Sequence, residues 1–524
     1  MIIGIDVGGT HTDAVLIGSG VLKKFKTPSA DLKKSVILAL EKLIDSNIDI
    51  ERISISTTLV TNSISKGNIE KAGIFLICDS PLSFLYENII PYIYTAHSYI
   101  DHRGEVIKDL SSNDLSSALE YFISNKIKNI GVVSKFSPRN PVLEKKAGDF
   151  FRKNGFNVVE GSTLSGKLDF PRRIMTTYLS SSVYSIYRSI ISDIESSIRS
   201  ILKDTEIMIV KADGGVVPIS DAIKRPVDTI LSGPAASIMG SLFHLKDFSE
   251  DFIIIDTGGT TSDIGFFINS SPVIERDGIS INNYKTLVRA LKVFSMPLGG
   301  DSVFNWSGNE LVISNVREGI PYCFGGLRVT VTDLALFGEN KKSEEGFIKE
   351  GLIDKIKIIE EKIISFIESY LKKAISLVNS RHIYTIKEFF ENRVFNPKKV
   401  LLVGGAAPYF KRFLDRLGYK VIIPKDYEVC NAIGSALARP SYELNLFANT
   451  LDARLSIPEI DYYEKIDRYF DETLARKIVF DKLKSITNFD VEIVEEEVFN
   501  MVRGFNTIGK NIRIVGQVIP GLII

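Results

Sequence analysis

The sequence predicts an α/β protein with two related lobes around a cleft, followed by a small α+β segment at its C-terminal end. Strand and helix patterns alternate along the chain, one strand–turn–strand motif occurs twice, and 524 residues are too many for one small core. We therefore expect an N-terminal lobe at 1–171, a second lobe with its connecting helices at 172–440, and a C-terminal segment at 441–524.

The alternation begins at the N-terminus. The apolar run at 2–17 is interrupted by Gly8 and Gly9, which predicts a hairpin closed by a glycine turn. Apolar residues at helical spacing predict helices at 35–46, 115–125 and 143–154. Short apolar runs predict the strands between them, at 53–57, 73–78 and 129–134.

The later elements follow from the same patterns. Two long amphipathic stretches predict one long helix each, at 172–203 and 346–380. The run VLLVGG at 400–405 predicts a buried strand that enters a glycine turn, with a helix from Ala407. After Pro440, the runs FDVEIV and NIRIVGQVI predict two further strands.

The composition excludes several classes of function. Lys and Arg number 64, as do Asp and Glu, and this balance argues against a nucleic-acid coat or a polybasic membrane anchor. Three scattered cysteines argue against a zinc ribbon or a disulfide framework, and no apolar run reaches the roughly 18 residues of a membrane span. We expect a cytoplasmic protein that binds neither nucleic acid nor membrane.

The first turn motif recurs about 250 residues later without gaps. The matching residues are Ile3, Ile5, Asp6, Gly8, Gly9, Thr10 and Asp13 in the first copy and Ile253, Ile255, Asp256, Gly258, Gly259, Thr260 and Asp263 in the second. A single copy is typical of any tight β-turn, whereas two copies in register favour an internal duplication with a shared function.

The residue types of this motif suit a polyphosphate. Glycines let backbone N–H groups approach phosphate oxygens, and the hydroxyls of Thr10 and Thr260 can donate hydrogen bonds to them. Asp6 and Asp256 would repel a bare phosphate, so we expect Mg²⁺ between carboxylate and phosphate. A third turn, Gly404–Gly405, follows a buried strand where a backbone can pass close to a nucleoside.

The order and spacing of the three turns resemble the phosphate and adenosine motifs of the actin, sugar-kinase and Hsp70 ATPase superfamily. That resemblance implies two actin-like (ribonuclease H-like) lobes with a nucleotide cleft, and ATP and Mg²⁺ as cofactors. No GxxxxGK[ST] or GxGxxG motif occurs, which argues against a P-loop or Rossmann protein.

Further blocks resemble the hydantoinase A / 5-oxoprolinase family, which includes the ATP-using subunits of acetone-type carboxylases. They are ISTTLVTNSISKG, PRRIMTTYLSS, KADGG with RPVDTILSGPAAS, and GIPYCFGGLRVTVTD. The resemblance covers residues 2–440 and implies an enzyme that activates the amide or carbonyl oxygen of a small molecule by phosphoryl transfer from ATP. It also implies a hydantoinase B-type partner subunit and is compatible with a homodimer.

The same resemblance assigns roles by position. The implied catalytic residues are Asp6, Asp13, Asp256 and Asp263, with Asp6 and Asp256 as metal ligands. The implied nucleotide-binding residues are Gly8, Gly9, Thr10, His11, Thr12, Gly258, Gly259, Thr260, Thr261, Gly299, Gly300, Asp301, Gly404, Gly405 and Ala406. The implied substrate residues are Thr57, Thr58, Asn62, Arg172 and Asp213.

Three of these residues allow more than one interpretation. His11 stands where the family commonly has an aromatic residue, and it either contacts phosphate or faces solvent as a turn residue. Asp301, in PLGGDSVF, replaces a family glycine and either orients a water or metal or caps a helix. Arg172 begins a helix where the dipole disfavours a cation, so it either faces an anion or forms an interlobe salt bridge.

Two rival functions remain open at this point, and a small-molecule kinase that releases its phosphorylated product is a third. Asp301 resembles the LGG(E/D) stretch of Hsp70-like ATPases, which favours an ATPase switch that reactivates or assembles a partner protein. The second rival is the ATP-using subunit of a ketone carboxylase, because the family resemblance includes such subunits.

Overall fold

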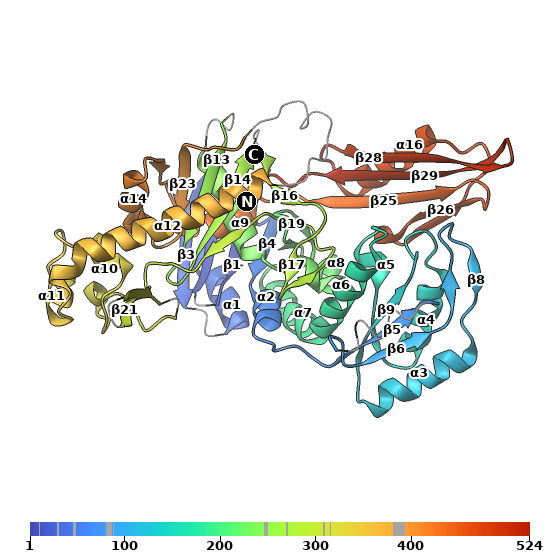
Figure 1. Ribbon diagram of the computed structural model, residues 1–524, viewed down its shortest axis with the longest axis horizontal. Helices are drawn as coiled ribbons and strands as arrows, with labels where there is room; N and C mark the ends of the chain where they lie inside the picture. Colours follow the sequence, from blue (N-terminus) through green and yellow to red (C-terminus); the bar gives the residue numbers. More distant parts are fainter. Residues whose placement is uncertain are drawn as a thin grey trace.

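The repeated motif forms a hairpin in each half of the chain, and each hairpin lies inside a larger sheet (Figure 1). The computed structural model describes residues 1–9, 11–28, 31–45, 49–79, 86, 88–245, 250–268, 271–307, 310–314, 316–380 and 394–523. The first hairpin joins β1 (Ile2–Val7) to β2 (His11–Ile17), and the second joins β13 (Phe252–Thr257) to β14 (Ser262–Ile268). The predicted α/β class is confirmed.

The two hairpins have the same turn and the same register. Gly8 N donates to His11 O at 3.0 Å, and Gly258 N donates to Thr261 O at 3.0 Å. The aspartates of each motif lie opposite each other in the strand pairing, Asp6 with Asp13 and Asp256 with Asp263. This correspondence in backbone geometry supports the internal duplication inferred from the sequence.

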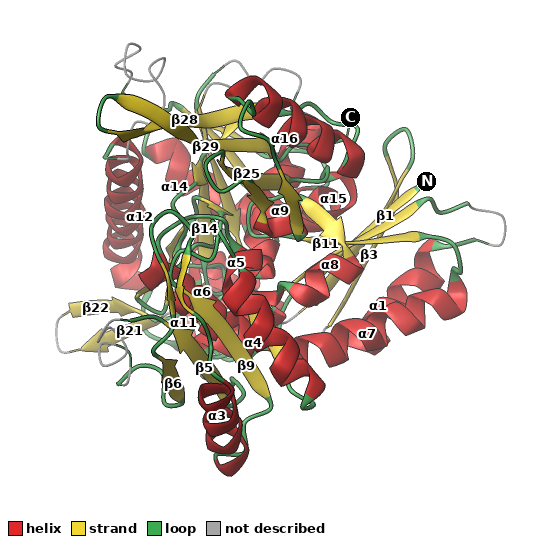
Figure 2. Ribbon diagram, turned by 90° about the vertical axis from the view of Figure 1, so that its right-hand side faces the viewer, coloured by secondary structure: helices red, strands yellow, loops and turns green. Residues whose placement is uncertain are grey.

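The first hairpin belongs to a six-stranded sheet in the order β12-β11-β4-β1-β2-β3. Its remaining strands are β3 (Val21–Pro28), β4 (Arg52–Thr57), β11 (Glu206–Val210) and β12 (Val216–Pro218). Helices α1 (Leu32–Leu43) and α7 (Tyr184–Ile201) lie side by side and pack their apolar faces into the core of this sheet (Figure 2). The sheet takes strands from both sides of residue 171, and a division of the chain there stays a prediction.

A second, four-stranded sheet follows in the order β10-β9-β5-β6, with all strands parallel. Its strands are β5 (Ala72–Ile77), β6 (Ile93–Ala96), β9 (Asn129–Ser134) and β10 (Asn157–Glu160). Helices α3 (Ser112–Ser124) and α4 (Val142–Lys153) cover it, at the positions that their apolar spacing predicts. Burial on both faces explains why β5 and β9 read as continuous apolar runs.

The long helix expected at 172–203 is wrong, because the structure has two helices there. Helix α6 (Phe170–Ser182) ends at Val183, and α7 begins at the next residue. Helix α6 packs against β9 of the four-stranded sheet, whereas α7 packs against α1. The chain changes direction between two layers, a change that apolar spacing alone does not reveal.

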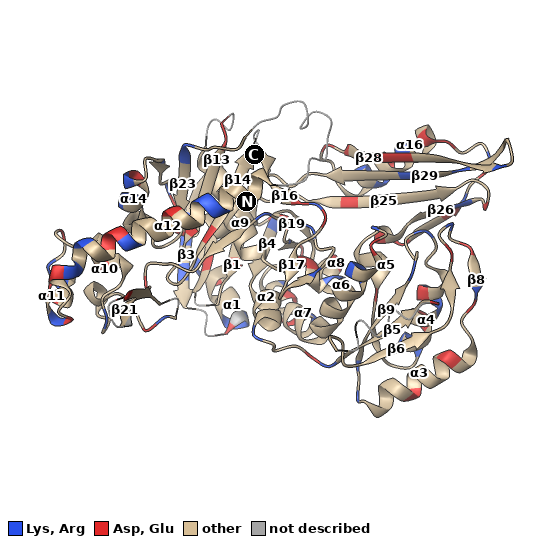
Figure 3. Cartoon of the chain, viewed as in Figure 1, with Lys and Arg blue, Asp and Glu red and all other residues tan. Residues whose placement is uncertain are grey.

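The helix expected at 346–380 is also two helices, α11 (Lys341–Lys349) and α12 (Ile356–Asn379). Gly351 separates them with φ +65°, a left-handed conformation that glycine adopts without strain and that commonly ends a helix. Positively and negatively charged residues alternate along the α12 ribbon (Figure 3), in keeping with the net charge of zero.

The second hairpin belongs to a sheet in the order β15-β14-β13-β23-β24, with β20 added on β14. The added strands are β15 (Ser271–Pro272), β20 (Phe294–Met296), β23 (Lys399–Val403) and β24 (Lys420–Ile422). As β4 does on β1, β23 pairs in parallel with β13 on the side away from the hairpin partner. Helix α14 (Ala407–Arg416) follows β23, as predicted.

Two short helices, α9 (Ser232–Ser241) and α15 (Cys430–Leu437), join the two halves. They pack backbone to backbone, and a Cβ atom on Gly240 or Gly434 would overlap the opposing helix. Helix α15 also lies against β1, although it follows the strands of the second hairpin's sheet in sequence. The two hairpins therefore lie on either side of the packed helices α9 and α15.

The C-terminal segment is larger than the two strands expected. It is a five-stranded antiparallel sheet in the order β27-β26-β25-β29-β28, covered by α16 (Glu472–Ile486). Its strands are β25 (Tyr442–Asn449), β26 (Arg454–Ile457), β27 (Tyr462–Lys465), β28 (Glu492–Arg503) and β29 (Asn506–Val518). Within the described ranges, no helix is both long and apolar enough to cross a membrane.

Candidate functional site

Carboxylates of the first hairpin form a buried, hydrogen-bonded cluster. Asn431, in the first turn of α15, donates its side-chain amide to Asp6 Oδ2 at 2.7 Å and to Asp13 Oδ2 at 3.0 Å. Ser56, the neighbour of Asp6 on β4, donates its hydroxyl to Asp6 Oδ1, and Lys26 Nζ lies 2.7 Å from Asp13 Oδ1. Groups from three elements, β3, β4 and α15, therefore hold these two carboxylates in place.

The pKa values of the hairpin aspartates indicate that the two hairpins border a common space. Burial, with smaller contributions from the charges of Asp13 and Asp256, raises the pKa of Asp6 to about 7 despite the hydrogen bond from Ser56. Burial likewise raises the pKa of Asp256 to about 6, against a hydrogen bond from Ser237 and with the help of the charges of Asp263 and Asp13. Because the carboxylates of one hairpin act on those of the other, the hairpins face each other.

Residues Gly299–Asp301 lie directly on the turn of the second hairpin. Gly300 N donates to Gly258 O at 3.0 Å and Asp301 N to Gly259 O at 2.7 Å, so the two backbones run in contact. A Cβ atom on Gly299 would stand 2.5 Å from Thr260 N, which explains glycine at this position. The structure thus brings these predicted residues together.

Asp301 and His11 lie near enough for the charge of each to act on the pKa of the other. Arg317 Nε lies 2.9 Å from Asp301 Oδ2, and burial raises the pKa of Asp301 although Arg317 opposes the shift. Burial lowers the pKa of His11, which also feels the charges of Lys26 and Arg317. His11 is thus half-buried among charged groups, and Asp301 pairs with Arg317 and is the N-cap of none of the described helices.

The third glycine turn lies directly against the second hairpin. Gly404 has φ +90°, and a Cβ atom there would overlap Asp256 Oδ1 and stand 2.5 Å from Thr257 O. Ala406 N donates to Thr257 O at 3.0 Å. An added Cβ at Gly405, by contrast, would meet no atom within 4 Å, so this side of the turn is open.

Three of the residues predicted for substrate adjoin the first hairpin. Thr58 N donates to Val7 O at 3.2 Å, and Asn62 Nδ2 donates to Thr58 Oγ1 at 3.1 Å and lies next to Gly9. Thr57 is buried and exchanges hydrogen bonds with Ser232 at the start of α9. Thr12 is buried in β2, and Thr10 lies outside the described residues.

The two other predicted substrate residues lie elsewhere. Arg172 Nη1 donates to Asp277 O at 2.5 Å, and its Nε lies 3.2 Å from Asp169, so it ties the start of α6 to a loop after β14. Asp213 is buried beside Lys211 and Ser441 and faces a separate cavity. Although burial acts to raise it, the neighbouring cations hold the pKa of Asp213 below its ordinary value.

Sequence reasoning missed the residues that support the carboxylates. They are Lys26, Ser56, Ser237, Ser295, Arg317 and Asn431. The position of Ser56, which pairs with Asp6 between parallel strands, could be read from strand register once the sheet order is known. The contact of Asn431 with Asp6 spans 425 residues of sequence, and no local pattern indicates it.

The carboxylate set is suited to Mg²⁺ that binds jointly with phosphate. Among the described residues, no group of three or more His, Cys, Asp or Glu side chains has the geometry of a metal cage. Mg²⁺ usually takes one or two carboxylates and completes its shell with water and phosphate oxygens. A divalent cation beside Asp6 and Asp256 would also offset the burial and the charge repulsion that together raise the pKa values of both carboxyls. The residues present therefore fit this ion.

Comparison with known protein families gives two matches that together span most of the chain. The profile described as "Hydantoinase/oxoprolinase N-terminal region" matches residues 2–155, and the profile described as "Hydantoinase/oxoprolinase" matches residues 173–444.

Individual relatives match over similar lengths. An uncharacterized protein of Methanocaldococcus jannaschii is 23% identical over 94% of this chain and 79% of its own length. Caprolactamase subunit alpha of Pseudomonas jessenii is 25% identical over 88% of this chain and 73% of its own.

Two solved structures share the fold over nearly the whole chain. The ATP-dependent caprolactamase of Pseudomonas jessenii superposes with a TM-score of 0.73 at 18% identity and covers 98% of this chain and 87% of its own. A nucleotide-free acetone carboxylase has a TM-score of 0.68 at 15% identity and covers 100% and 88%.

Proposed function

The chain belongs to the hydantoinase/oxoprolinase family, and from this premise we propose that it is an ATP- and Mg²⁺-dependent enzyme subunit that activates an amide oxygen by phosphoryl transfer. The observation that carries the proposal is the mutual influence of Asp6, Asp13 and Asp256, which come from two equivalent hairpins. The matched caprolactamase is described as ATP-dependent and the matched acetone carboxylase as part of an ATP-dependent carboxylation, which supports the choice of nucleotide.

The three glycine turns would divide the nucleotide between them. The turns at Gly8–Gly9 and Gly258–Gly259 would hold the phosphates through their backbones, and the open side of Gly405 would leave room for the nucleoside. Asp6 and Asp256 would hold Mg²⁺, which supplies neutralising charge on the phosphates when it is bound.

The other carboxylates would orient the attacking group. Asp13 is held by Lys26 and Asn431 and therefore stays fixed opposite Asp6. Asp263 is half-buried in β14 and accepts a hydrogen bond from Ser295. Positioning and charge neutralisation of this kind supply most of the rate in phosphoryl transfer.

The substrate oxygen would lie beside the first turn. Asn62 adjoins Gly9 and Thr58 adjoins Val7 there, and they offer the amide and hydroxyl groups that bind a carbonyl oxygen. We place a lactam or hydantoin first because the caprolactamase subunit matches most of the chain in both sequence and fold. The name of that relative as a subunit supports a hydantoinase B-type partner for this chain as well.

A ketone carboxylase subunit is the second candidate, favoured by the likeness to acetone carboxylase over the whole chain. The two candidates differ in what stimulates turnover. ATP hydrolysis should rise with lactams or hydantoins for the first, and only with a ketone plus bicarbonate for the second. Stimulation by a protein partner alone would favour a switch.

The proposal is tested by nucleotide binding and turnover. Calorimetry with a non-hydrolysable ATP analogue and Mg²⁺ should show one site per chain, and Asp256→Asn should lower ATP turnover by roughly 100-fold. Asp415→Asn, on the exposed face of α14 where Asp415 pairs with Lys411, serves as a matched control and should change neither. Absence of analogue binding in the folded wild-type chain would overturn the proposal.

A further inference from the structure

A second cavity lies between the N-terminal half and the C-terminal sheet. It has a volume of about 900 Å³ and is bounded by α4, β10, α8 (Ile219–Lys224) and β25. Of the predicted site residues that the structure describes, Asp213 alone lines it. Its volume lies in the range of small-molecule sites, and it is separate from the hairpin carboxylates.

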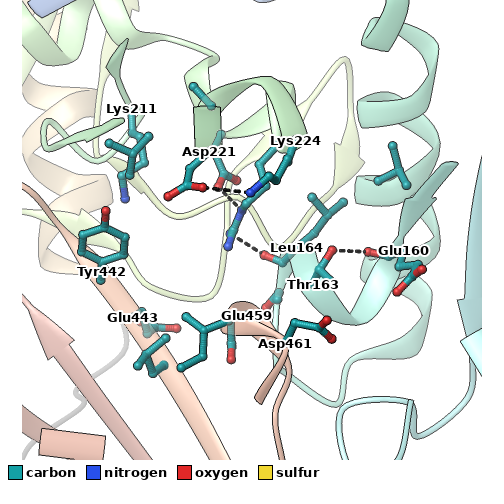
Figure 4. A pocket seen from close by; sticks show the side chains of 18 of the residues that line it. Glu160, Thr163, Leu164, Lys211, Asp221, Lys224, Tyr442, Glu443, Glu459 and Asp461 are labelled. Carbon is teal, nitrogen blue, oxygen red and sulfur yellow. Dashed lines mark hydrogen bonds and ion pairs between the residues drawn. The ribbon is translucent and has the colours of Figure 1, made fainter. Parts of the chain in front are cut away.

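Figure 4 shows how charge is distributed over two opposing walls. Lys211, Asp221 and Lys224 project from the wall formed by β11 and α8, whereas Tyr442, Glu443 and Asp461 lie on the wall of the C-terminal sheet. Cationic and anionic groups thus face the same space from different layers of the fold.

At one end of the cavity, two cations and two anions form a loosely joined network. Lys211 Nζ lies 3.2 Å from Asp213, and Arg289 lies 3.7 Å from Asp213 and 3.5 Å from Glu443. Charge-assisted hydrogen bonds between such groups are normally about 2.7–2.9 Å long. All four side chains are largely buried, with Glu443, the most exposed, at 19%.

The members of this network differ in how many of their polar atoms are hydrogen-bonded. Asp213 accepts hydrogen bonds from Ser441 Oγ at 2.9 Å and from Gly215 N at 3.1 Å, so its carboxylate is fully engaged in the fold. Arg289, in contrast, has no hydrogen-bond partner for Nε or Nη2 within the described part of the chain. Its hydrogen bond from Nη1 to Glu443 is long, at 3.5 Å, and its Nε is 3.7 Å from Asp213.

Such an unsatisfied guanidinium is unusual in a protein interior, because buried polar groups are nearly always hydrogen-bonded. A carboxylate offers Arg a planar pair of acceptors, and Lys211 is close enough to the network to contribute a second cation. If a ligand carboxylate binds Arg289, Glu443 loses its long hydrogen bond from Arg289. Glu443 can then accept a hydrogen bond from a cationic group on the same ligand.

We propose that this cavity is a second ligand site that binds a small amino acid through both of its charges. Arg289 and Lys211 bind the carboxylate, and Glu443 binds the ammonium group. A ligand with a negative charge alone would leave Glu443 unpaired, and one with a positive charge alone would leave Arg289 as it is. The proposal requires no nucleotide and is independent of the proposed ATP chemistry.

The test is calorimetry on the full chain without nucleotide. Glycine, β-alanine and γ-aminobutyrate serve as zwitterions of increasing length, and butyrate and butylamine as controls with one charge each. At least one zwitterion should bind about tenfold more tightly than either control, since one added charge-assisted contact contributes roughly 1.4 kcal/mol or more. Equal binding of the controls, or no binding of any zwitterion, would overturn the proposal.

Variants separate the two halves of the site. Glu443→Gln should abolish the preference of the site for zwitterions over butyrate, whereas Arg289→Gln should weaken the binding of both about tenfold or more. Lys372→Gln, on the exposed face of α12, is the control and should change neither. Thermal melting checks folding, and Glu443→Gln still decides the question if Arg289→Gln does not fold. A zwitterion preference that survives Glu443→Gln contradicts the proposal.

Discussion

Gly404 lies against Asp256 so closely that any side chain on Gly404 would overlap the Asp256 carboxylate. The third glycine turn therefore sets the position of a carboxylate that belongs to the second hairpin. This relationship links a residue expected to border the nucleoside with one expected to hold the metal, and it makes the third turn part of the proposed metal site as well.

Gly404→Ala should abolish nucleotide binding, or reduce it by at least about tenfold, because the new methyl group displaces Asp256 and the residue must also keep φ +90°. Calorimetry with the ATP analogue and Mg²⁺ measures the effect. Gly405→Ala is the matched control, since its Cβ would meet nothing within 4 Å, and it should bind normally. Equal affinities for the two variants would contradict this account of the turn.

Asn431 is a positioning residue, because it donates to both Asp6 and Asp13. Asn431→Ala should lower ATP turnover at pH 7 about tenfold, since hydrogen bonds to charged groups contribute roughly 1.5–3 kcal/mol. Loss of this donor raises the pKa of Asp6 further, so activity should partly recover at higher pH. Asn154→Ala, which removes an amide from the exposed end of α4, should have no effect. A pH profile identical to that of the wild type would argue against this role.

Mg²⁺-nucleotide affinity should fall as the solution becomes more acidic. Protons compete with the cation for Asp6 and Asp256, whose pKa values are raised by burial to about 7 and about 6. We expect a loss of roughly tenfold or more between about pH 7.5 and about pH 6, measured by calorimetry with the ATP analogue. Asp6→Asn should remove most of this dependence. An affinity that is flat over this range would contradict the proposed ligands.

Asp6→Asn should stabilise the chain in the absence of metal and nucleotide. The folded pKa of Asp6 lies near 7 and its ordinary value is 3.8, so ionisation costs folding free energy; this cost is absent below about pH 4 and complete above about pH 7. The melting temperature with EDTA should therefore rise by a few degrees at pH 8 and by less at pH 5. Asp415→Asn should shift it at neither pH, and an equal gain for Asp6→Asn at both would show a different cause.

Local patterns carried much of the fold. Apolar periodicity located both hairpins, α1, α3, α4, β23 and α14, because each of these elements buries one face or a whole strand against a core. It failed at 172–203 and 346–380, where the apolar spacing continues while the chain turns into another layer. It also missed β25, β26, β27 and α16, which belong to a sheet in which β25 pairs with β29 far along the chain.

The candidate site likewise contains residues that local patterns predict and residues that only tertiary packing brings to it. Matching Asp6, Asp13, Asp256 and Asp263 between the two copies needed only the sequence, because each pair is set by a local turn and a strand register. The residues that hold these carboxylates were invisible, since Asn431 and Lys26 reach them only through the packing of other elements.

The sequence by itself determined the two hairpins and the residue types that suit phosphate and magnesium, because these depend on backbone geometry within about ten residues. Tertiary structure alone decided which predicted residues meet. It placed Thr58 and Asn62 beside the first turn, Arg172 on a loop contact, and Asp213 in a separate cavity with Arg289. The physical reason is that burial, hydrogen bonding and charge coupling act through space between segments that are hundreds of residues apart in the chain.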